Sequence, residues 1–333
     1  MIFQEISAGA ISPQMPACRA IVVNVGETGG VTAALKELSS FQEYTVYVVN
    51  TSLSKLGQVL NRCSEVGVPA IVNCGEKLPE TKVWHPEQKY SATLISPGSY
   101  SQNAQKEGNE EEDILNFILN DPFADSFSNI GYQSYRYSPD TMQKLQLRYF
   151  EEMRLGVLRS NLTLCEPLVR NCEYAFIDMH SVRYSDYPHS GNSYPNGMYA
   201  EEICTVARYI GLSQRLKSIF LFGEECSNGE LTICNRLISE VIWHICEGIA
   251  SNIIENPNEK TAEELFQKKI VTLGENGEDI TFITSYTTRR WWMEVPAKDG
   301  ANICGPCSIE DYKCACSGEI PLRWLFFYQK QAL

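Results

Sequence analysis

The feature of this 333-residue sequence that most constrains its fold is a series of short, unbroken apolar runs, each closed by glycine or a polar residue. Apolar runs without polar alternation are typical of strands that are buried on both faces, as in a parallel sheet. Between two of these runs, residues 52–67 place apolar side chains at helical spacing, with Ser52 as a cap and Gly67 as a stop signal. The first four predicted strands are Arg19–Glu27, Tyr44–Asn50, Val68–Gly75 and Ser91–Gly98.

The same alternation of strand and helix continues to about residue 260, and the pattern then changes. Alternating strands and helices predict an α/β fold, a three-layer sandwich around a doubly wound and mostly parallel sheet. The tail instead predicts three strands and then two helices. We therefore expect a main α/β domain over residues 1–260 and a C-terminal β/α extension over residues 261–333 packed on it. The later predicted strands are 127–133, 173–182, 216–225, 268–274, 278–286 and 290–296, and the later predicted helices are 139–161, 199–211, 230–254, 308–318 and 321–329.

Composition excludes two classes of partner. The net charge is −13 and lysines and arginines do not cluster, whereas nucleic acids and anionic lipids are bound by clustered cations. The N-terminal segment has no basic region followed by an apolar one, and no stretch reaches the ~20 apolar residues of a membrane helix. We expect a cytoplasmic protein without nucleic-acid or membrane partners, whose thirteen cysteines are reduced thiols.

One pair of residues could carry chemistry. An apolar run ends at Asp178, and His180 follows two residues later. Side chains two apart in a strand share a face, and ligands of α/β sheets gather at the carboxyl ends of strands. The pair could bind a single Zn²⁺ with a third group such as Glu76, or it could form a hydrogen bond that lines a cleft.

The segment around this pair resembles a known family. "FIDMHSVRYSDYP" (176–188) and "MYAEEICTVARYIG" (198–211) are similar to motifs of the arginase, agmatinase and formimidoylglutamase superfamily, the ureohydrolases. "FSNIGYQSY" (127–135), "RRWWMEVP" (289–296) and "PCSIEDYKCACSGEIPLRW" (306–324) resemble a formimidoylglutamase-like branch found in Bacteroidetes. The resemblance covers residues 120–330 well, so residues 1–120 are the divergent part.

The resemblance implies hydrolysis of a guanidino or formimidoyl C–N bond by a hydroxide that two Mn²⁺ ions share. The family builds that centre from a Gly-Gly-x-His segment, an Asp-Ala-His-x-Asp segment and an Asp-x-Asp pair. The corresponding places here are Asn73–Lys77, which has no histidine, and Ile95–Tyr100, which has neither an acid nor a histidine. In the last pair the second Asp is replaced by His180, so only Asp178 is retained in kind.

Two functions follow from this comparison. The first is a family protein with a degenerate metal site and no cofactor, acting as a non-catalytic scaffold, binding or regulatory protein, with Asp178, His180 and Asp186 as remnants of the site. The second is a divergent metal-dependent hydrolase of linear amidines. In that case Mn or Zn is held by Asp178, His180 and Glu76, and Arg183 anchors a substrate carboxylate. A small-molecule ligand and self-association of the chain are expected partners.

A separate cysteine cluster lies near the end of the chain. Cys304, Cys307, Cys314 and Cys316 follow the spacing Cys-x2-Cys-x6-Cys-x-Cys. Four thiolates are a common set of ligands for structural zinc, but those ligand pairs are usually separated by two to four residues, not one. Ordinary thiols and a redox pair are the alternatives.

Overall fold

The chain forms two compact units. The first comprises Met1–Met142 and Glu151–Asn252, and the second comprises Gln143–Phe150 and Ile253–Leu333. Within the residues that are described, no helix is long and apolar enough to cross a membrane. The computed structural model describes residues 1–26, 29–40, 43–98, 113–188, 194–223, 232–259, 264–273, 279–297, 300 and 302–332.

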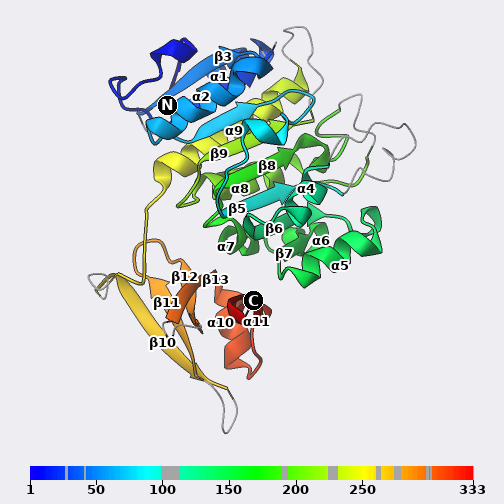
Figure 1. Cartoon of the computed structure of the whole chain (residues 1–333), viewed down its shortest axis with the longest axis vertical. Helices are drawn as coiled ribbons and strands as arrows, with labels where there is room; N and C mark the ends of the chain where they lie inside the picture. The colour runs from blue at the N-terminus through cyan, green and yellow to red at the C-terminus, as the bar shows by residue number, and fades with distance from the viewer. Residues whose placement is uncertain are drawn as a thin grey trace. The chain divides into compact units, whose positions relative to one another are not determined.

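The first unit is built on a nine-stranded sheet whose paired strands are all parallel, as the sequence predicted (Figure 1). The chain starts near one edge, crosses to both sides of β2, and later inserts β8 and β9 into the middle of the sheet. In sheet order, the strands are β1 (Ile2–Glu5), β3 (Thr45–Thr51), β2 (Ala20–Val25), β4 (Ala70–Asn73), β9 (Ser218–Phe222), β8 (Tyr174–Asp178), β5 (Tyr90–Ile95), β6 (Ala124–Tyr132) and β7 (Glu151–Arg154).

Helices cover both faces of this sheet, which gives the predicted three-layer sandwich. On one face, α1 (Gly29–Glu37), α6 (Leu155–Ser160), α7 (Glu166–Val169), α8 (Ala200–Gly211) and α9 (Ile233–Ser251) share a core with the strands. The glycines of α8 and α9 allow a close crossing, because a Cβ on Gly211 would lie 2.3 Å from the carbonyl oxygen of Ile245.

Aromatic side chains fill the other face. Trp84 packs 4.8 Å from the ring of Phe176 on β8 and 5.8 Å from Phe117 on α4 (Ile114–Asn120). A Cβ on Gly57 of α2 (Leu53–Glu65) would lie 3.8 Å from the carbonyl oxygen of Val83, the residue before Trp84, so α2 and α4 both lie on this face. The short 3₁₀ turns are η1 (Ala8–Ala10), η2 (Thr81–Val83), η3 (Ser134–Arg136), η4 (Leu162–Cys165) and η5 (Met179–Ser181).

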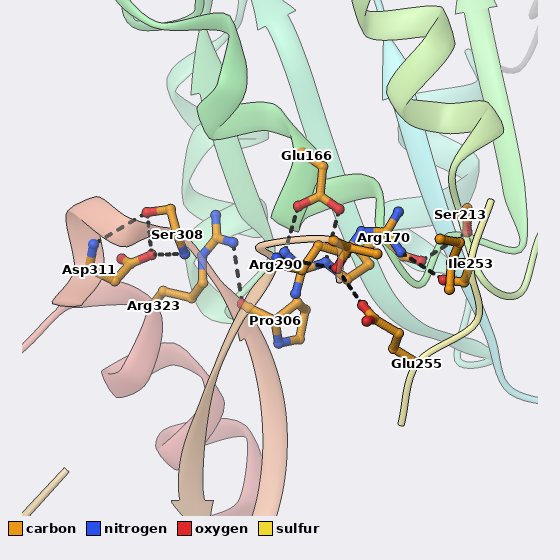
Figure 2. Close-up of polar contacts among 11 residues, drawn as sticks. Glu166, Arg170, Ser213, Ile253, Glu255, Arg290, Pro306, Ser308, Asp311 and Arg323 are labelled. Carbon is orange, nitrogen blue, oxygen red and sulfur yellow. Dashed lines mark hydrogen bonds and ion pairs between the residues drawn. The ribbon is translucent and has the colours of Figure 1, made fainter. Parts of the chain in front are cut away.

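The turn that leads into β8 is held by a buried ion pair. Arg170 is 1% exposed, and its guanidinium makes two hydrogen bonds to Glu166 one helical turn earlier (Figure 2). The hydroxyl of Ser213 donates to the carbonyl oxygen of Arg170 at 3.1 Å, which ties this turn to the end of α8. These bonds connect α7, the turn before β8 and the segment after α8, at the end of β8 opposite to Asp178.

The helix predicted over residues 139–161 is wrong. The chain forms α5 (Pro139–Leu147), then the edge strand β7, then α6. Tyr149 adopts a φ of 49°, in the left-handed region, which ends α5. The apolar residues of this stretch have helix-compatible spacing, but pairing of β7 with β6 decides the structure. The short and mostly exposed β1 also has no apolar run that would predict it.

The second unit contains a four-stranded antiparallel sheet and two helices after it (Figure 1). Three of the strands and both helices lie close to those predicted for the tail, and the fourth strand, at residues 302–307, was not predicted. Phe282, Met293 and Trp324 belong to the core between one sheet face and the helices. A capping box begins α10, since Asp311 N donates to Ser308 Oγ and Ser308 N to Asp311 Oδ2 (Figure 2). The elements are β10 (Phe266–Thr272), β11 (Asp279–Ser285), β12 (Trp291–Pro296), β13 (Asn302–Cys307), α10 (Ile309–Cys316) and α11 (Leu322–Ala332).

Candidate functional site

The candidate site lies at the carboxyl edge of the first unit's sheet, where β4, β9, β8 and β5 are consecutive neighbours. The segments that the sequence comparison singled out all follow these strands. Asn73 ends β4, Ile95 ends β5 and Asp178 ends β8. Parallel strands bring their carboxyl ends to one edge, so these segments meet in space.

Asp178 and His180 are brought together as predicted from their spacing. The Asp178 carboxylate is fully buried, and Oδ1 accepts hydrogen bonds from His180 N at 2.9 Å and His180 Nδ1 at 2.8 Å. The first bond caps the 3₁₀ turn η5, which starts where β8 ends. The imidazole is only partly buried, so the pair consists of an interior acid and a histidine at the rim of the edge.

Burial and the nearby charge shift the pKa of His180 in opposite directions. Burial alone lowers the pKa of His180, while the hydrogen bond and the charge of Asp178 raise it, and the net pKa of His180 is raised. The carboxylate therefore favours the imidazolium form and fixes the ring orientation. A histidine held in this way is a hydrogen-bond donor toward Asp178 through Nδ1.

Two further residues close around the pair, and the sequence analysis missed both. Ser96, just after β5, places Oγ 3.5 Å from Asp178 Oδ2 and donates to the carbonyl oxygen of Gly98 at 2.9 Å. Gly223, just after β9, has a φ of +88°, and a Cβ there would lie 2.6 Å from His180 Nδ1. A glycine directly after an apolar strand was the available signal for Gly223. For Ser96 the signal was its place in the segment Ile95–Tyr100, but its residue type did not single it out.

Glu76 does not join the pair through its side chain. The backbone carbonyl oxygen of Glu76 accepts a hydrogen bond from Gly223 N at 3.1 Å, which places its backbone near the site, but the residue is exposed. Among the described residues, no three of His, Cys, Asp and Glu are grouped so that they could hold a metal ion. The predicted ligand set of Asp178, His180 and Glu76 is therefore not assembled in this structure.

Arg183 and Asp186 form a second pair in the loop after β8. Arg183 Nε donates to Asp186 Oδ1 at 2.7 Å, and the guanidinium lies 4.0 Å from the ring centre of Tyr199. Asp186 also accepts from Ala200 N at 3.0 Å, at the start of α8. Burial raises the pKa of Asp186, but these hydrogen bonds outweigh it and lower the pKa overall. The predicted substrate anchor Arg183 is thus engaged in ordering this loop.

A pair of Mn²⁺ ions does not fit the described donor set at this edge. Two such ions carry four positive charges and prefer several hard oxygen ligands. The described residues of the three segments offer one buried carboxylate, Asp178, whose oxygens already face His180 and Ser96. In the segment after β5, Ser99 and Tyr100 lie outside the described residues.

The four cysteines of the predicted zinc site are not brought together either. Cys304 and Cys307 are an odd number of residues apart on β13, so they point to opposite sheet faces. Cys307 belongs to the helix-covered core, whereas Cys304 packs beside Trp292 on the other face. Burial raises the pKa of Cys304 to about 11, which opposes the thiolate form that zinc requires. Cys316, on α10, is exposed.

Comparison with known proteins gives matches in structure only. No protein-family profile matches the sequence, and no curated protein sequence matches it. A Trypanosoma cruzi formiminoglutamase, solved with Mn²⁺, superposes with a TM-score of 0.56 at 13% identity, covering 71% of this chain and 95% of that chain. A Bacillus subtilis formimidoylglutamase gives a TM-score of 0.58 at 11% identity, covering 75% of this chain and 92% of that chain.

A third matching structure belongs to a protein with a different name. An agmatine ureohydrolase of Thermoplasma volcanium has a TM-score of 0.53 at 11% identity, and the match covers 72% of this chain and 94% of that chain. The Bacteroidetes branch suggested by the C-terminal motifs stays a prediction. At these identities the comparisons establish the architecture, and they match the predicted one: the chain has the arginase-like fold of the formimidoylglutamases and agmatine ureohydrolases.

Proposed function

We propose that this chain uses an arginase-like fold for binding, as a non-catalytic scaffold or regulatory protein, and that its binuclear metal centre is degenerate. The observation that supports the proposal is the burial and hydrogen bonding of the Asp178 carboxylate. This one retained carboxylate is buried and accepts two hydrogen bonds from His180, with Ser96 next to its other oxygen. A carboxylate engaged in this way stabilises the fold at the end of β8 and is not arranged to bridge two cations.

The positions that would complete the centre support the same reading. Asn73 ends β4 with its side chain buried, and its Oδ1 accepts from Gly75 N at 3.4 Å. In the segments that the resemblance assigns to the family's other ligands, the buried polar side chains of Asn73 and Ser96 are an amide and a hydroxyl, and neither offsets the charge of a divalent ion. Without that charge, a bound water would not reach the low pKa that amidine hydrolysis by hydroxide requires.

Hydrolysis assays test the proposal directly. The purified full-length chain is incubated with Mn²⁺ or Zn²⁺ and given N-formimidoyl-L-glutamate, arginine or agmatine. The proposal predicts no release of formamide, ammonia or urea above the level of the Asp178→Asn variant. Metal-dependent turnover that disappears in Asp178→Asn would refute it.

The competing function is a divergent metal-dependent hydrolase of linear amidines. The observation in its favour is that Asp178 and His180 do lie side by side at the carboxyl end of β8. In addition, Glu224 and Glu225 follow Gly223 in the sequence, outside the described residues. Turnover lost in Asp178→Asn and in Glu224→Gln or Glu225→Gln would establish this function instead.

A further inference from the structure

A pocket lies at the carboxyl ends of β6 and β7, the two strands at the margin of the sheet opposite β1. Its volume is about 410 Å³, within the range of about 300–1,000 Å³ that small-molecule sites occupy. The walls come from three segments of the first unit. They are the end of β6 with η3, the end of β7 with α6, and Asn196 in the loop before α8.

The pocket presents a cation, Arg154, that has no ion-pair partner among the described residues. Arg154 ends β7 opposite Tyr132 of β6, and it is exposed. Within the described residues its guanidinium has no hydrogen bond and no ion pair. The nearest acid along the strand, Glu152, accepts a hydrogen bond from the hydroxyl of Tyr132 at 2.9 Å and forms no ion pair with Arg154. In an acidic protein, an arginine left unpaired at a concave surface marks a place for an anion.

The remaining polar groups hold the wall in place. Gln133 is 5% exposed, and its Nε2 donates to the carbonyl oxygen of Asn196 at 2.8 Å. Asn196 Nδ2 donates in return to Gln133 Oε1 at 3.0 Å and to the hydroxyl oxygen of Tyr135 at 3.1 Å. These reciprocal bonds connect the end of β6 to the loop before α8, so this side of the pocket is preformed, not assembled by a ligand.

The second arginine of the pocket has a different role. Arg159 Nε lies 3.2 Å from both carboxylate oxygens of Glu202, and its guanidinium stacks 4.4 Å from the ring centre of Tyr199. Its charge is therefore balanced, and it joins α6 to α8. Among the described residues, Arg154 is thus the arginine of the pocket that has no ion-pair partner.

We propose that this pocket binds a small carboxylate-bearing molecule, whose acid group pairs with the guanidinium of Arg154. The planar guanidinium matches a carboxylate in a two-point contact. Leu155, Val157 and the rings of Tyr132 and Tyr135 line the same hollow and give an apolar surface to a carbon skeleton. An inorganic oxyanion would leave that surface without contacts.

This proposal rests on the proposed function, because it names the ligand class of the binding role, but it depends on other residues. The hydrolysis assays test Asp178, whereas ligand titrations test Arg154. The full-length chain is titrated by calorimetry with succinate, L-glutamate and benzoate, with their neutral amides, and with inorganic phosphate. The proposal predicts saturable binding of at least one carboxylate, with a Kd of about 1 mM or tighter.

Two variants and a control locate the binding. Arg154→Gln removes the charge-assisted contact and should weaken carboxylate binding by about 10- to 100-fold. Gly156→Leu fills the pocket from α6, where an added Cβ meets no atom within 4 Å, so it should abolish binding while the chain stays folded. Arg19→Gln removes an equally exposed charge just before β2, at the amino edge, and should leave binding unchanged.

Four results would overturn the proposal. They are no saturable binding of any carboxylate, equal binding of a carboxylate and its neutral amide, phosphate binding tighter than every carboxylate, and unchanged binding in Arg154→Gln. Loss of binding in a variant counts only if its thermal unfolding midpoint stays near that of the parent. Gly156→Leu is expected to keep or raise that midpoint, since it replaces an open helical glycine.

Discussion

Replacing Asp178 by alanine tests whether this acid is now a structural residue. The change removes the acceptor of two hydrogen bonds from the partly buried His180 and of the longer contact with Ser96, and the carboxylate that is lost is itself fully buried. A buried, charge-assisted hydrogen bond contributes about 1.5–3 kcal/mol, and the contact at 3.5 Å contributes little. The two His180 bonds share one oxygen and are not additive, so we expect a loss of about 3–5 kcal/mol in the free energy of unfolding.

The companion variants separate charge from hydrogen bonding. Asp178→Asn keeps an acceptor for His180 and should lose about 1–2 kcal/mol. Asp125→Ala serves as the control, because Asp125 forms an exposed ion pair with Lys89 at 3.3 Å and should change stability by less than about 1 kcal/mol. Urea unfolding followed by far-UV circular dichroism measures each variant.

The same stability measurement can also refute a structural role for Asp178. An acid preserved for a function, and not for the fold, sits in an unfavourable environment, and its removal leaves stability unchanged or raises it. If Asp178→Ala is as stable as the parent or more stable, the account of Asp178 as a structural acid fails.

Three further predictions test other parts of the structure. Gly223→Ala should destabilise the chain by about 2–4 kcal/mol because the added Cβ would meet His180. The control is Gly26→Ala, at a similar φ of +80° but with no atom within 4 Å of the added Cβ, and it should cost only about 1 kcal/mol. Equal losses in thermal unfolding would contradict the contact with His180. Asp121 is 6% exposed, and burial raises its pKa, but hydrogen bonds from Tyr90, Phe123 N and His85 lower the pKa overall. The stability that Asp121 contributes is therefore present above the unfolded pKa of about 4 and is lost as the pH falls through the lower folded pKa. Unfolding midpoints measured from pH 6 to pH 2 should therefore fall less steeply in Asp121→Asn than in the parent, and parallel curves would refute this. Cys307→Ala should destabilise the second unit by about 1 kcal/mol or more and Cys316→Ala by less than about 0.5 kcal/mol, since the first thiol is buried and the second exposed; equal, larger losses that excess zinc reverses would indicate the zinc site instead.

The sheet of the first unit could be predicted because its central strands are buried on both faces. In β2, β3, β4, β5, β8 and β9 this burial demands unbroken apolar runs, and such runs are visible in the sequence. Strands at the sheet edges are not buried on both faces, so they need no unbroken apolar run. In β7 only Met153 is buried, so nothing in the local pattern distinguishes this strand from a continuing helix.

The candidate site was predictable only where its residues are close in the chain. The contact between Asp178 and His180 could be predicted because the two residues lie two positions apart at the end of one strand. Ser96 reaches the same carboxylate from another strand, and Arg154 is exposed only because β7 ends there. The zinc alternative for the cysteine cluster met a related obstacle: without β13 in the predicted tail, the opposite directions of Cys304 and Cys307 could not be inferred from the sequence.

The measurement that bears most directly on the account is the metal content of the intact chain. The protein is loaded with excess Mn²⁺, freed of unbound metal by gel filtration, and analysed by mass spectrometry beside Asp178→Asn. Because the described residues of this edge offer one buried and already engaged carboxylate, we predict less than about 0.1 manganese per chain in both proteins. About two manganese per chain in the parent, lost in the variant, would contradict the claim that this arginase-like fold has given up its metal centre.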